Sequence, residues 1–280
     1  MKLRSFFHLL GLKPKSREYD TRLETFHLPQ DGVVEYAQWL HPKDTPKQIQ
    51  QQAVDSLREF INPGDVAIDI GAHSGDSTLP IALAAGRTGR VFAFEPNPYV
   101  FRVLQQNAGL NQDKTHIVPY AFAATLTDGP IEFEYSDPGF CNGGRHEGVS
   151  RWKHGHAFTL TVQGRNLDTF LRTRHAESLP KLRYIKVDAE GYDPVVVESL
   201  RPLLAEFRPV LKTEIFKLLK RTDRQQFLSR LAEMKYRCFR LIGETEQPAE
   251  RIDENNVHQW EHFDLLCLPE AKARPNFAAA

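Results

Sequence analysis

The chain has 280 residues, enough for one substantial domain with an appendage or for two small domains. Hydrophobic residues make up 41% and aromatic residues 10% of the sequence, which predicts an ordinary globular protein with a buried core. The 36 basic residues balance the 36 acidic ones. No net positive charge therefore favours nonspecific binding to phosphates, and a nucleic acid partner is not expected.

The cysteines and the N-terminus point to the cytoplasm. Cys141, Cys238 and Cys267 form no CxxC pair, which argues against a disulfide framework and against a structural zinc site. No apolar run approaches the roughly 20 residues of a membrane-spanning helix. The basic and apolar start, residues 1–13, is interrupted by His8 and lacks a small-residue cleavage site. It is interpreted as a floppy or amphipathic segment, which leaves peripheral contact with a membrane surface open.

Residues 1–60 are polar and irregular, and four prolines interrupt them. A helix is expected only near their end, where apolar residues recur at helical spacing: Ile49, Ala53, Val54, Leu57 and Ile61. No role can be assigned to this extension from its sequence.

From residue 66 onward, strand and helix signals alternate. Short apolar runs predict strands at 66–70, 91–94 and 116–123, and helical spacing predicts helices at 77–85 and 100–108. Strands that alternate with helices indicate βαβ units, in which helices cover both faces of a parallel sheet.

The middle of the chain breaks this rhythm. Residues 131–135 alternate apolar and polar side chains, as a half-exposed antiparallel strand would, and a loop rich in Gly, Asn and His follows at 136–156. The alternation then resumes with predicted strands at 184–188 and 209–216 and predicted helices at 194–207 and 227–234.

The last two predicted strands, 237–242 and 263–268, have only a loop between them. We expect them to be antiparallel, because no helix is available for a right-handed crossover. The predicted fold is α/β, a Rossmann-like seven-stranded and mostly parallel sheet with an antiparallel last strand. The expected units are an N-terminal extension (1–60), a main domain (61–270) and a C-terminal tail (271–280).

Ligands of open α/β sheets bind beyond the carboxyl ends of the strands, which directs attention to the segment Asp69–Gly75 and to Glu95. Gly71 closes the first strand, where a residue without Cβ permits a tight turn, and Gly75 lies at the entrance to a helix. Asp69 is suited to anchor the loop or the charged amino-acid end of a cofactor. Glu95 ends the next strand, where its carboxylate can accept hydrogen bonds from ribose hydroxyls.

The glycine spacing selects among adenosine-type cofactors. A dinucleotide site needs G-x-G-x-x-G, whereas Gly71 is followed by glycine only at position 75, with His73 where the second glycine would admit a pyrophosphate. The terminal antiparallel strand pair also resembles the sheet of class I methyltransferases. S-adenosylmethionine is therefore the expected cofactor, and the residues assigned to its binding are Asp69, Gly71, Ala72, His73, Gly75, Glu95, Pro96 and Asn97.

Several further segments resemble the FkbM family of methyltransferases. Beside 69–75 they are 94–98, Asn107-Ala-Gly-Leu-Asn111, the loop Cys141-Asn142-Gly143-Gly144, 186–191 and 208–214. The resemblance implies transfer of a methyl group from S-adenosylmethionine to oxygen, often a hydroxyl of a sugar, a glycoconjugate or a secondary metabolite. It also implies cofactor contacts at Gly71 and Glu95, and it does not cover residues 1–60.

Methyl transfer to a hydroxyl needs alignment and a proton acceptor, or a cation that lowers the pKa of the hydroxyl. Lys186, Asp188 and Glu190 end a predicted strand and are the catalytic candidates, with helix capping or bracing of the loop as the alternative for the two acids. Asp188 and Glu214 end adjacent strands, which leaves a magnesium site open, although a brace for the pocket is the commoner role of such a pair.

The loop 136–156 holds three histidines, His146, His154 and His156, which lack the pattern of a zinc site. Its Phe140 and Trp152 could either stack on a sugar or anchor the loop. The expected partner is a small-molecule or glycan substrate, and the oligomeric state cannot be read from the sequence. Two alternative functions are N-methylation of protein or nucleic acid, and cofactor binding without catalysis.

Overall fold

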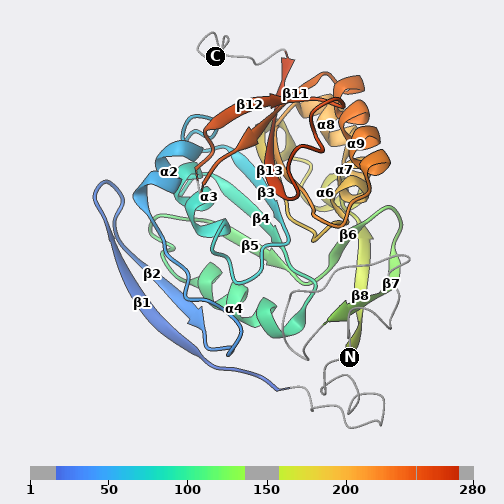
Figure 1. The fold of residues 1–280 in the computed structure, drawn as a ribbon. Helices are drawn as coiled ribbons and strands as arrows, with labels where there is room; N and C mark the ends of the chain where they lie inside the picture. Colours follow the sequence, from blue (N-terminus) through green and yellow to red (C-terminus); the bar gives the residue numbers. More distant parts are fainter. Residues whose placement is uncertain (1–16, 136–157, 244, 271–280) are drawn as a thin grey trace.

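The computed structural model describes residues 17–135, 158–243 and 245–270. An eight-stranded sheet runs through the centre of the molecule in the order β12-β11-β13-β10-β9-β3-β4-β5 (Figure 1). Its parallel part comprises β3 (Val66–Ile70), β4 (Arg90–Phe94), β5 (Ile117–Tyr120), β9 (Leu182–Val187) and β10 (Val210–Ile215).

The last strands confirm the predicted antiparallel ending. Strand β13 (Phe263–Pro269) lies between β10 and β11 (Tyr236–Leu241) and is antiparallel to both. The expected count of seven strands is wrong, because β12 (Pro248–Ile252) adds an edge strand beside β11. This strand was missed because three of its five side chains are exposed, so its sequence lacks an apolar pattern.

Helices cover both faces of the sheet, and each face has its own hydrophobic core. On one face lie α6 (Leu167–Arg174), α7 (Asp193–Ser199), α8 (Arg201–Phe207) and α9 (Arg221–Glu233). The other face is covered by α2 (Gln51–Leu57) and α3 (Thr78–Ala85), with α4 (Pro98–Gly109) contributing Leu104. Within the described residues, no helix is long and apolar enough to cross a membrane.

The single helix predicted at 194–207 is two helices, with the break at Leu200. Pro202 lies in the first turn of α8, where its missing N–H costs nothing, whereas inside one continuous helix it would remove a hydrogen bond and clash with the preceding turn. The short helix α6 was not predicted, because only two of its residues, Leu167 and Leu171, are buried.

A smaller sheet stands beside the carboxyl edge of β4 and β5. It has the order β6-β8-β7, with β6 at Ala123–Thr125, β7 at Gly129–Tyr135 and β8 at Phe158–Asn166. Strand β7 confirms the predicted antiparallel strand at 131–135. The predicted strand at 116–123 divides between β5 and β6, which belong to different sheets.

The expectation that residues 1–60 are irregular before their closing helix is wrong. Strands β1 (Thr21–Leu28) and β2 (Gly32–Trp39) form an antiparallel hairpin, and Figure 1 shows it alongside α4. Pro29 lies in the turn between the two strands and interrupts neither. Val34 and Tyr36, two residues apart on β2, are fully buried and attach the hairpin to the main body.

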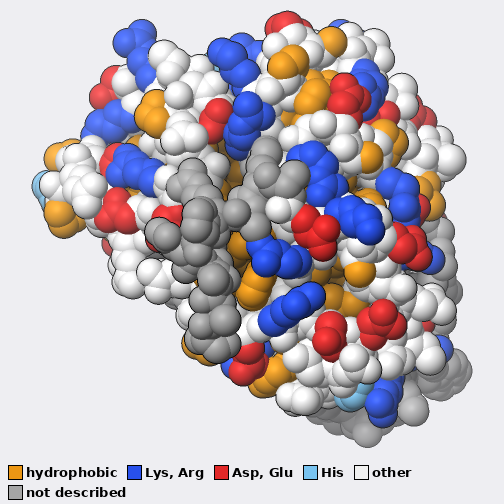
Figure 2. Space-filling view, turned by 90° about the horizontal axis from the view of Figure 1, so that it is seen from above, with side chains coloured by type: hydrophobic (Ala, Val, Ile, Leu, Met, Phe, Trp, Pro, Cys, Tyr) orange, Lys and Arg blue, Asp and Glu red, His pale blue; other side chains and the backbone are white. Residues whose placement is uncertain are grey.

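The surface carries both charges. Lys and Arg side chains are interspersed with Asp and Glu over the face shown in Figure 2, in keeping with the equal numbers of basic and acidic residues.

Two cysteines that are distant in the sequence, Cys238 and Cys267, are opposite each other on β11 and β13. Their sulfur atoms are 3.4 Å apart, and both residues are free and buried.

Candidate active site

The loop that follows β3 folds over the end of β4. The N–H groups of Gly71 and Ala72 both donate to the carbonyl of Phe94, at 3.0 and 3.1 Å. Gly71 has φ +76° and His73 has φ +50°, so the chain turns away from the sheet within three residues. This turn leaves the space directly above the strand ends open to a ligand.

Asp69 lies beneath this loop and is fully buried. Its Oδ2 accepts hydrogen bonds from Thr78 Oγ1 at 2.6 Å and from Ser77 Oγ at 2.9 Å, and thereby joins β3 to the start of α3. Asp69 does not line the pocket described below, so its contacts are those of a loop anchor rather than of a ligand contact.

Glu95 immediately follows β4 and is 6% exposed. Its two carboxylate oxygens accept hydrogen bonds from the N–H groups of His73 (3.0 Å) and Asn97 (2.8 Å). Burial raises the pKa of Glu95 to about 7, against the effect of these two hydrogen bonds. The carboxylate is therefore fixed at the edge of the pocket and titrates near neutral pH.

A pocket of about 500 Å³ opens above the carboxyl ends of β3, β4 and β9. Of the sequence-predicted site residues, seven line it: Gly71, His73, Glu95, Pro96, Lys186, Asp188 and Glu190. The remaining four are buried and do not line it: Asp69, Ala72, Gly75 and Asn97. Asn97 caps α4, because its side chain accepts a hydrogen bond from the N–H of Tyr99.

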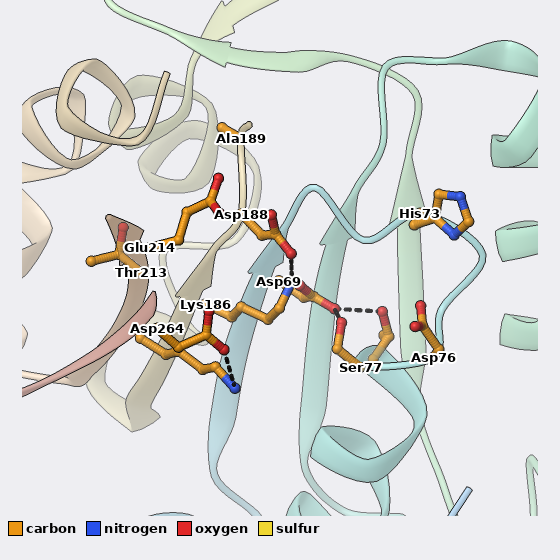
Figure 3. A network of polar contacts seen from close by, with 12 residues as sticks. Asp69, His73, Asp76, Ser77, Lys186, Asp188, Ala189, Thr213, Glu214 and Asp264 are labelled. Carbon is orange, nitrogen blue, oxygen red and sulfur yellow. Dashed lines mark hydrogen bonds and ion pairs between the residues drawn. The ribbon is translucent and has the colours of Figure 1, made fainter. Parts of the chain in front are cut away.

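Lys186 is the buried cation of the site. Its Nζ lies 3.2 Å from Asp188 Oδ2 and 3.5 Å from Asp69 Oδ1, so it joins the end of β3 to the turn after β9 (Figure 3). Burial alone would lower its pKa, but the surrounding carboxylates of Asp188, Asp69 and Asp76 raise it above the usual value. Lys186 therefore stays protonated and serves as a fixed positive charge rather than as a base.

Glu190 and Asp188 both face the pocket from the turn after β9. Burial, and then the neighbouring charge of Asp188, raise the pKa of Glu190 above the ordinary glutamate value. Asp188 is paired with Lys186, and the raised pKa of Glu190 increases the affinity of its carboxylate for a proton.

The turn itself is braced by Asp193, a residue that the sequence analysis missed. Its Oδ2 accepts from the N–H groups of Ala189 and Gly191 (both 3.2 Å), and its Oδ1 accepts from Thr213 Oγ1 at 3.0 Å. Asp193 is fully buried. The available signal was its place directly before Pro194 at the start of a helix, where an aspartate commonly binds free N–H groups.

Glu214, considered above as a metal ligand, lies against Asp193, whose Oδ1 accepts from the N–H of Glu214 at 3.4 Å. Burial, and then the negative charge of Asp193, raise the pKa of Glu214 well above its usual range. Over the residues that the structure describes, no group of three or more His, Cys, Asp or Glu side chains is placed to hold a metal ion.

Two further parts of the pocket wall were not foreseen. The segment after β2 contributes Lys43, Asp44, Thr45 and Lys47, and the small sheet contributes Phe133 and Tyr135. The sequence could not link either segment to the site, because each is distant from the other site residues in the chain and reaches them only in the folded protein. The loop candidates Phe140, Cys141–Gly144, His146, Trp152, His154 and His156 lie outside the described residues.

The sheet order, the loop after its first parallel strand and the acid after the second are those of a class I methyltransferase. The sequence model of the methyltransferase FkbM domain matches residues 69–241, and the chain belongs to this family of methyltransferases. Hexuronic acid methyltransferase AglP of Haloferax volcanii is 28% identical over 151 residues, which are 54% of this chain and 56% of that protein. The matched region thus spans little more than half of the relative.

Solved structures resemble the chain at low sequence identity. A methyltransferase FkbM from Methylobacillus flagellatus is 14% identical, with 77% of this chain and 51% of that chain covered and a TM-score of 0.45. A SAM-dependent O-methyltransferase from Thermotoga maritima is 12% identical, with 95% and 97% covered and a TM-score of 0.42.

Proposed function

We propose that this protein transfers a methyl group from S-adenosylmethionine to a hydroxyl of a sugar, a glycoconjugate or a secondary metabolite. The observation that carries the proposal is the position of Glu95, a buried carboxylate at the rim of the pocket, next to the loop 71–76. Glu95 and the loop are suited to hold the ribose and the adjoining part of the donor, with Gly71, His73 and Pro96 in contact with it.

The charges of the pocket suit this donor. Asp76, Asp188 and Glu190 offer negative charge to a sulfonium and an ammonium group, while Lys47 and Lys186 offer positive charge to a carboxylate. S-adenosylmethionine carries all three groups. A donor of this kind supplies an electrophilic methyl carbon, and the role left to the protein is to align the acceptor and to remove its proton.

In the proposed reaction the acceptor oxygen forms a bond to the methyl carbon while the carbon–sulfur bond breaks, and its electron pair remains on sulfur. We assign the released proton to Glu190, whose raised pKa favours its acceptance. Lys186 holds Asp188 in place beside it. The aromatic rings of Phe133 and Tyr135 supply a wall against which a sugar ring can lie.

The sugar is proposed as the acceptor because the curated relative is a hexuronic acid methyltransferase. The test is to incubate the protein with donor labelled in its methyl group and with fractions of polysaccharide, glycolipid, small metabolites, protein and nucleic acid. We expect the label to appear as a methoxy group in one of the first three fractions. Label on nitrogen in the protein or nucleic acid fraction would overturn the proposal.

Replacing Glu95 by alanine should weaken binding of S-adenosylmethionine about tenfold to a hundredfold, because hydrogen bonds to a charged acceptor are lost. Isothermal titration calorimetry measures the dissociation constant directly. The control is Glu206→Ala, which removes a carboxylate whose side chain is 53% exposed and lies outside the pocket. Equal affinity in wild type and Glu95→Ala would contradict the assigned donor site.

Donor binding should also depend on pH through Glu95. Its pKa lies at about 7 in the free protein, and only the ionised carboxylate accepts hydrogen bonds from both ribose hydroxyls. Below this pKa, affinity should fall by up to about tenfold per pH unit, and above it the affinity should level off. Titrations at several pH values with wild type and Glu95→Gln separate this effect from ionisation of the donor itself, since only the wild type should show the Glu95 contribution.

A further inference from the structure

Two asparagines of the segment Asn107–Asn111 pair with the free edge of strand β2. Asn107 Oδ1 accepts from the N–H of Ala37 at 2.6 Å, and its Nδ2 donates to the carbonyl of Ala37 at 3.2 Å. Asn111 repeats the arrangement with Glu35, at 2.9 Å to the N–H and 2.8 Å to the carbonyl. Each side-chain amide thus binds both backbone groups of one strand residue.

This pairing follows from the geometry of a strand. Residues two apart, such as Glu35 and Ala37, present their N–H and C=O groups to the same edge. The opposite edge of β2 is occupied by β1. The end of α4 and the turn after it therefore take the place of a third strand, and the hairpin becomes fixed to the main sheet domain through residues far from it in the sequence.

Of the two asparagines, Asn107 also holds the loop 71–76. Asn107 Nδ2 donates to the carbonyl of Ser74 at 2.8 Å, and Tyr36 of β2 donates its hydroxyl to Ser74 Oγ at 2.7 Å. Ser74 is 1% exposed and Tyr36 is fully buried. Ser74 Oγ in turn lies 3.0 Å from Nδ1 of His73, which lines the pocket.

The loop is thus held from two opposite sides. From the sheet, the carbonyl of Phe94 binds Gly71 and Ala72, and the carboxylate of Glu95 binds His73. From the hairpin side, Tyr36 and Asn107 bind Ser74. Because His73, a residue with a side chain, has φ +50°, the shape of the loop is not the one that a free chain prefers, and the contacts on both sides help to maintain it.

The hairpin also fixes a second part of the pocket wall. The side-chain amide of Gln38 on β2 accepts from the N–H of Lys47 at 2.8 Å and donates to its carbonyl at 2.6 Å. Lys47 lines the pocket, with its Nζ 3.6 Å from Asp76 of the loop. One strand, β2, therefore supports the wall of the pocket at two places, through Ser74 and through Lys47.

We propose that the β1–β2 hairpin and the end of α4 together support the donor site, in which Tyr36 of the hairpin and Asn107 of α4 are positioning residues that hold residues 71–76 in their ligand-binding shape through Ser74. The inference rests on the proposed function only in naming S-adenosylmethionine as the ligand. A loop that is already ordered loses less conformational entropy when the donor binds, so release of Ser74 weakens binding without removing any direct contact.

The test compares two tyrosine hydroxyls that are both buried. Tyr36→Phe removes the hydrogen bond to Ser74, which is 2.7 Å long. Tyr236→Phe removes a hydrogen bond of similar length, 2.8 Å, to the carbonyl of Pro209, which lies outside the pocket. We expect similar small losses of thermal stability from the two variants. Tyr36→Phe alone should raise the dissociation constant for S-adenosylmethionine, by about fivefold, the effect of one buried hydrogen bond.

Hydrogen exchange of the free proteins gives a second readout that needs no donor. Amides of residues 71–76 should exchange faster in Tyr36→Phe and in Asn111→Ala than in the wild type. The second variant loosens the hairpin without touching Ser74. In Tyr236→Phe the exchange of these amides should be unchanged. If wild type binds S-adenosylmethionine but exchange and affinity are the same in all three variants, the inference is overturned. If wild type does not bind it, the proposed function fails, and the exchange of residues 71–76 still decides the positioning role.

Discussion

Replacing Gly71 by alanine should abolish detectable binding of S-adenosylmethionine and lower the stability of the fold by at least about 3 kcal/mol. A Cβ at this position would lie 1.8 Å from the carbonyl oxygen of Asp188. That oxygen belongs to the backbone and is held in place, because the N–H of Asp188 donates to the carbonyl of Ile70 at 2.9 Å. Neither side can move without breaking the contact between the loop after β3 and the turn after β9.

Two other glycines separate the causes of this effect. Gly243→Ala places a side chain at φ +80° with nothing within 4 Å of its Cβ, so it reports backbone strain without a clash. Gly109→Ala has neither a positive φ nor a neighbour within 4 Å, and should change little. The measurements are urea unfolding and calorimetry with the donor. A Gly71→Ala protein as stable as Gly243→Ala, with unchanged donor affinity, would show that the close approach to Asp188 is unimportant.

The proposed donor half of the site could be outlined from the sequence because the residues that form it are close together in the chain. A strand, a glycine that ends it and an acid that follows the next strand lie within the 30 residues 66–95, and the parallel sheet brings them together by itself. Gly71 and Glu95 accordingly line the same pocket, and their contact with a cofactor stays a prediction. Asp69, in contrast, was open to two roles, and its hydrogen bonds to Ser77 and Thr78 favour the loop anchor.

The rest of the site depends on contacts across long sequence distances. Tyr36 is 38 residues from Ser74 and Asn107 is 70 residues from Ala37, and no spacing rule connects such pairs. The hairpin was also hidden by composition, since Pro29 was taken to interrupt structure when it lies in a turn. Short or exposed elements such as α6 and β12 bury too few side chains for their sequences to show a hydrophobic periodicity.

Replacing Lys186 by methionine should destabilise the protein by about 3–5 kcal/mol, because it leaves a charged partner buried without its counter-charge. Asp69 is that partner. It is fully buried, and its Oδ1 has no hydrogen bond, so the ammonium group of Lys186 at 3.5 Å compensates this oxygen. Met keeps the length and the apolar stem of the side chain and removes only the charge. The free energy of unfolding in urea measures the loss.

A double-mutant cycle identifies which carboxylate is responsible. Asp69→Asn combined with Lys186→Met should cost less than the sum of the two single changes, because the buried charge and its partner disappear together. Asp188→Asn should cost less than about 1 kcal/mol, since that side chain is 47% exposed and Lys186 keeps its ion pair with Asp69. Arg172→Met is the control for an ordinary surface cation, because it breaks ion pairs with Asp168 and Glu206 at the surface. Its loss of unfolding free energy should be as small as that of Asp188→Asn. Additive losses for Asp69 and Lys186 would mean that the two charges do not compensate each other. Coupling between them would instead make Lys186 the residue that allows an ionised aspartate to anchor the start of α3 from within the core.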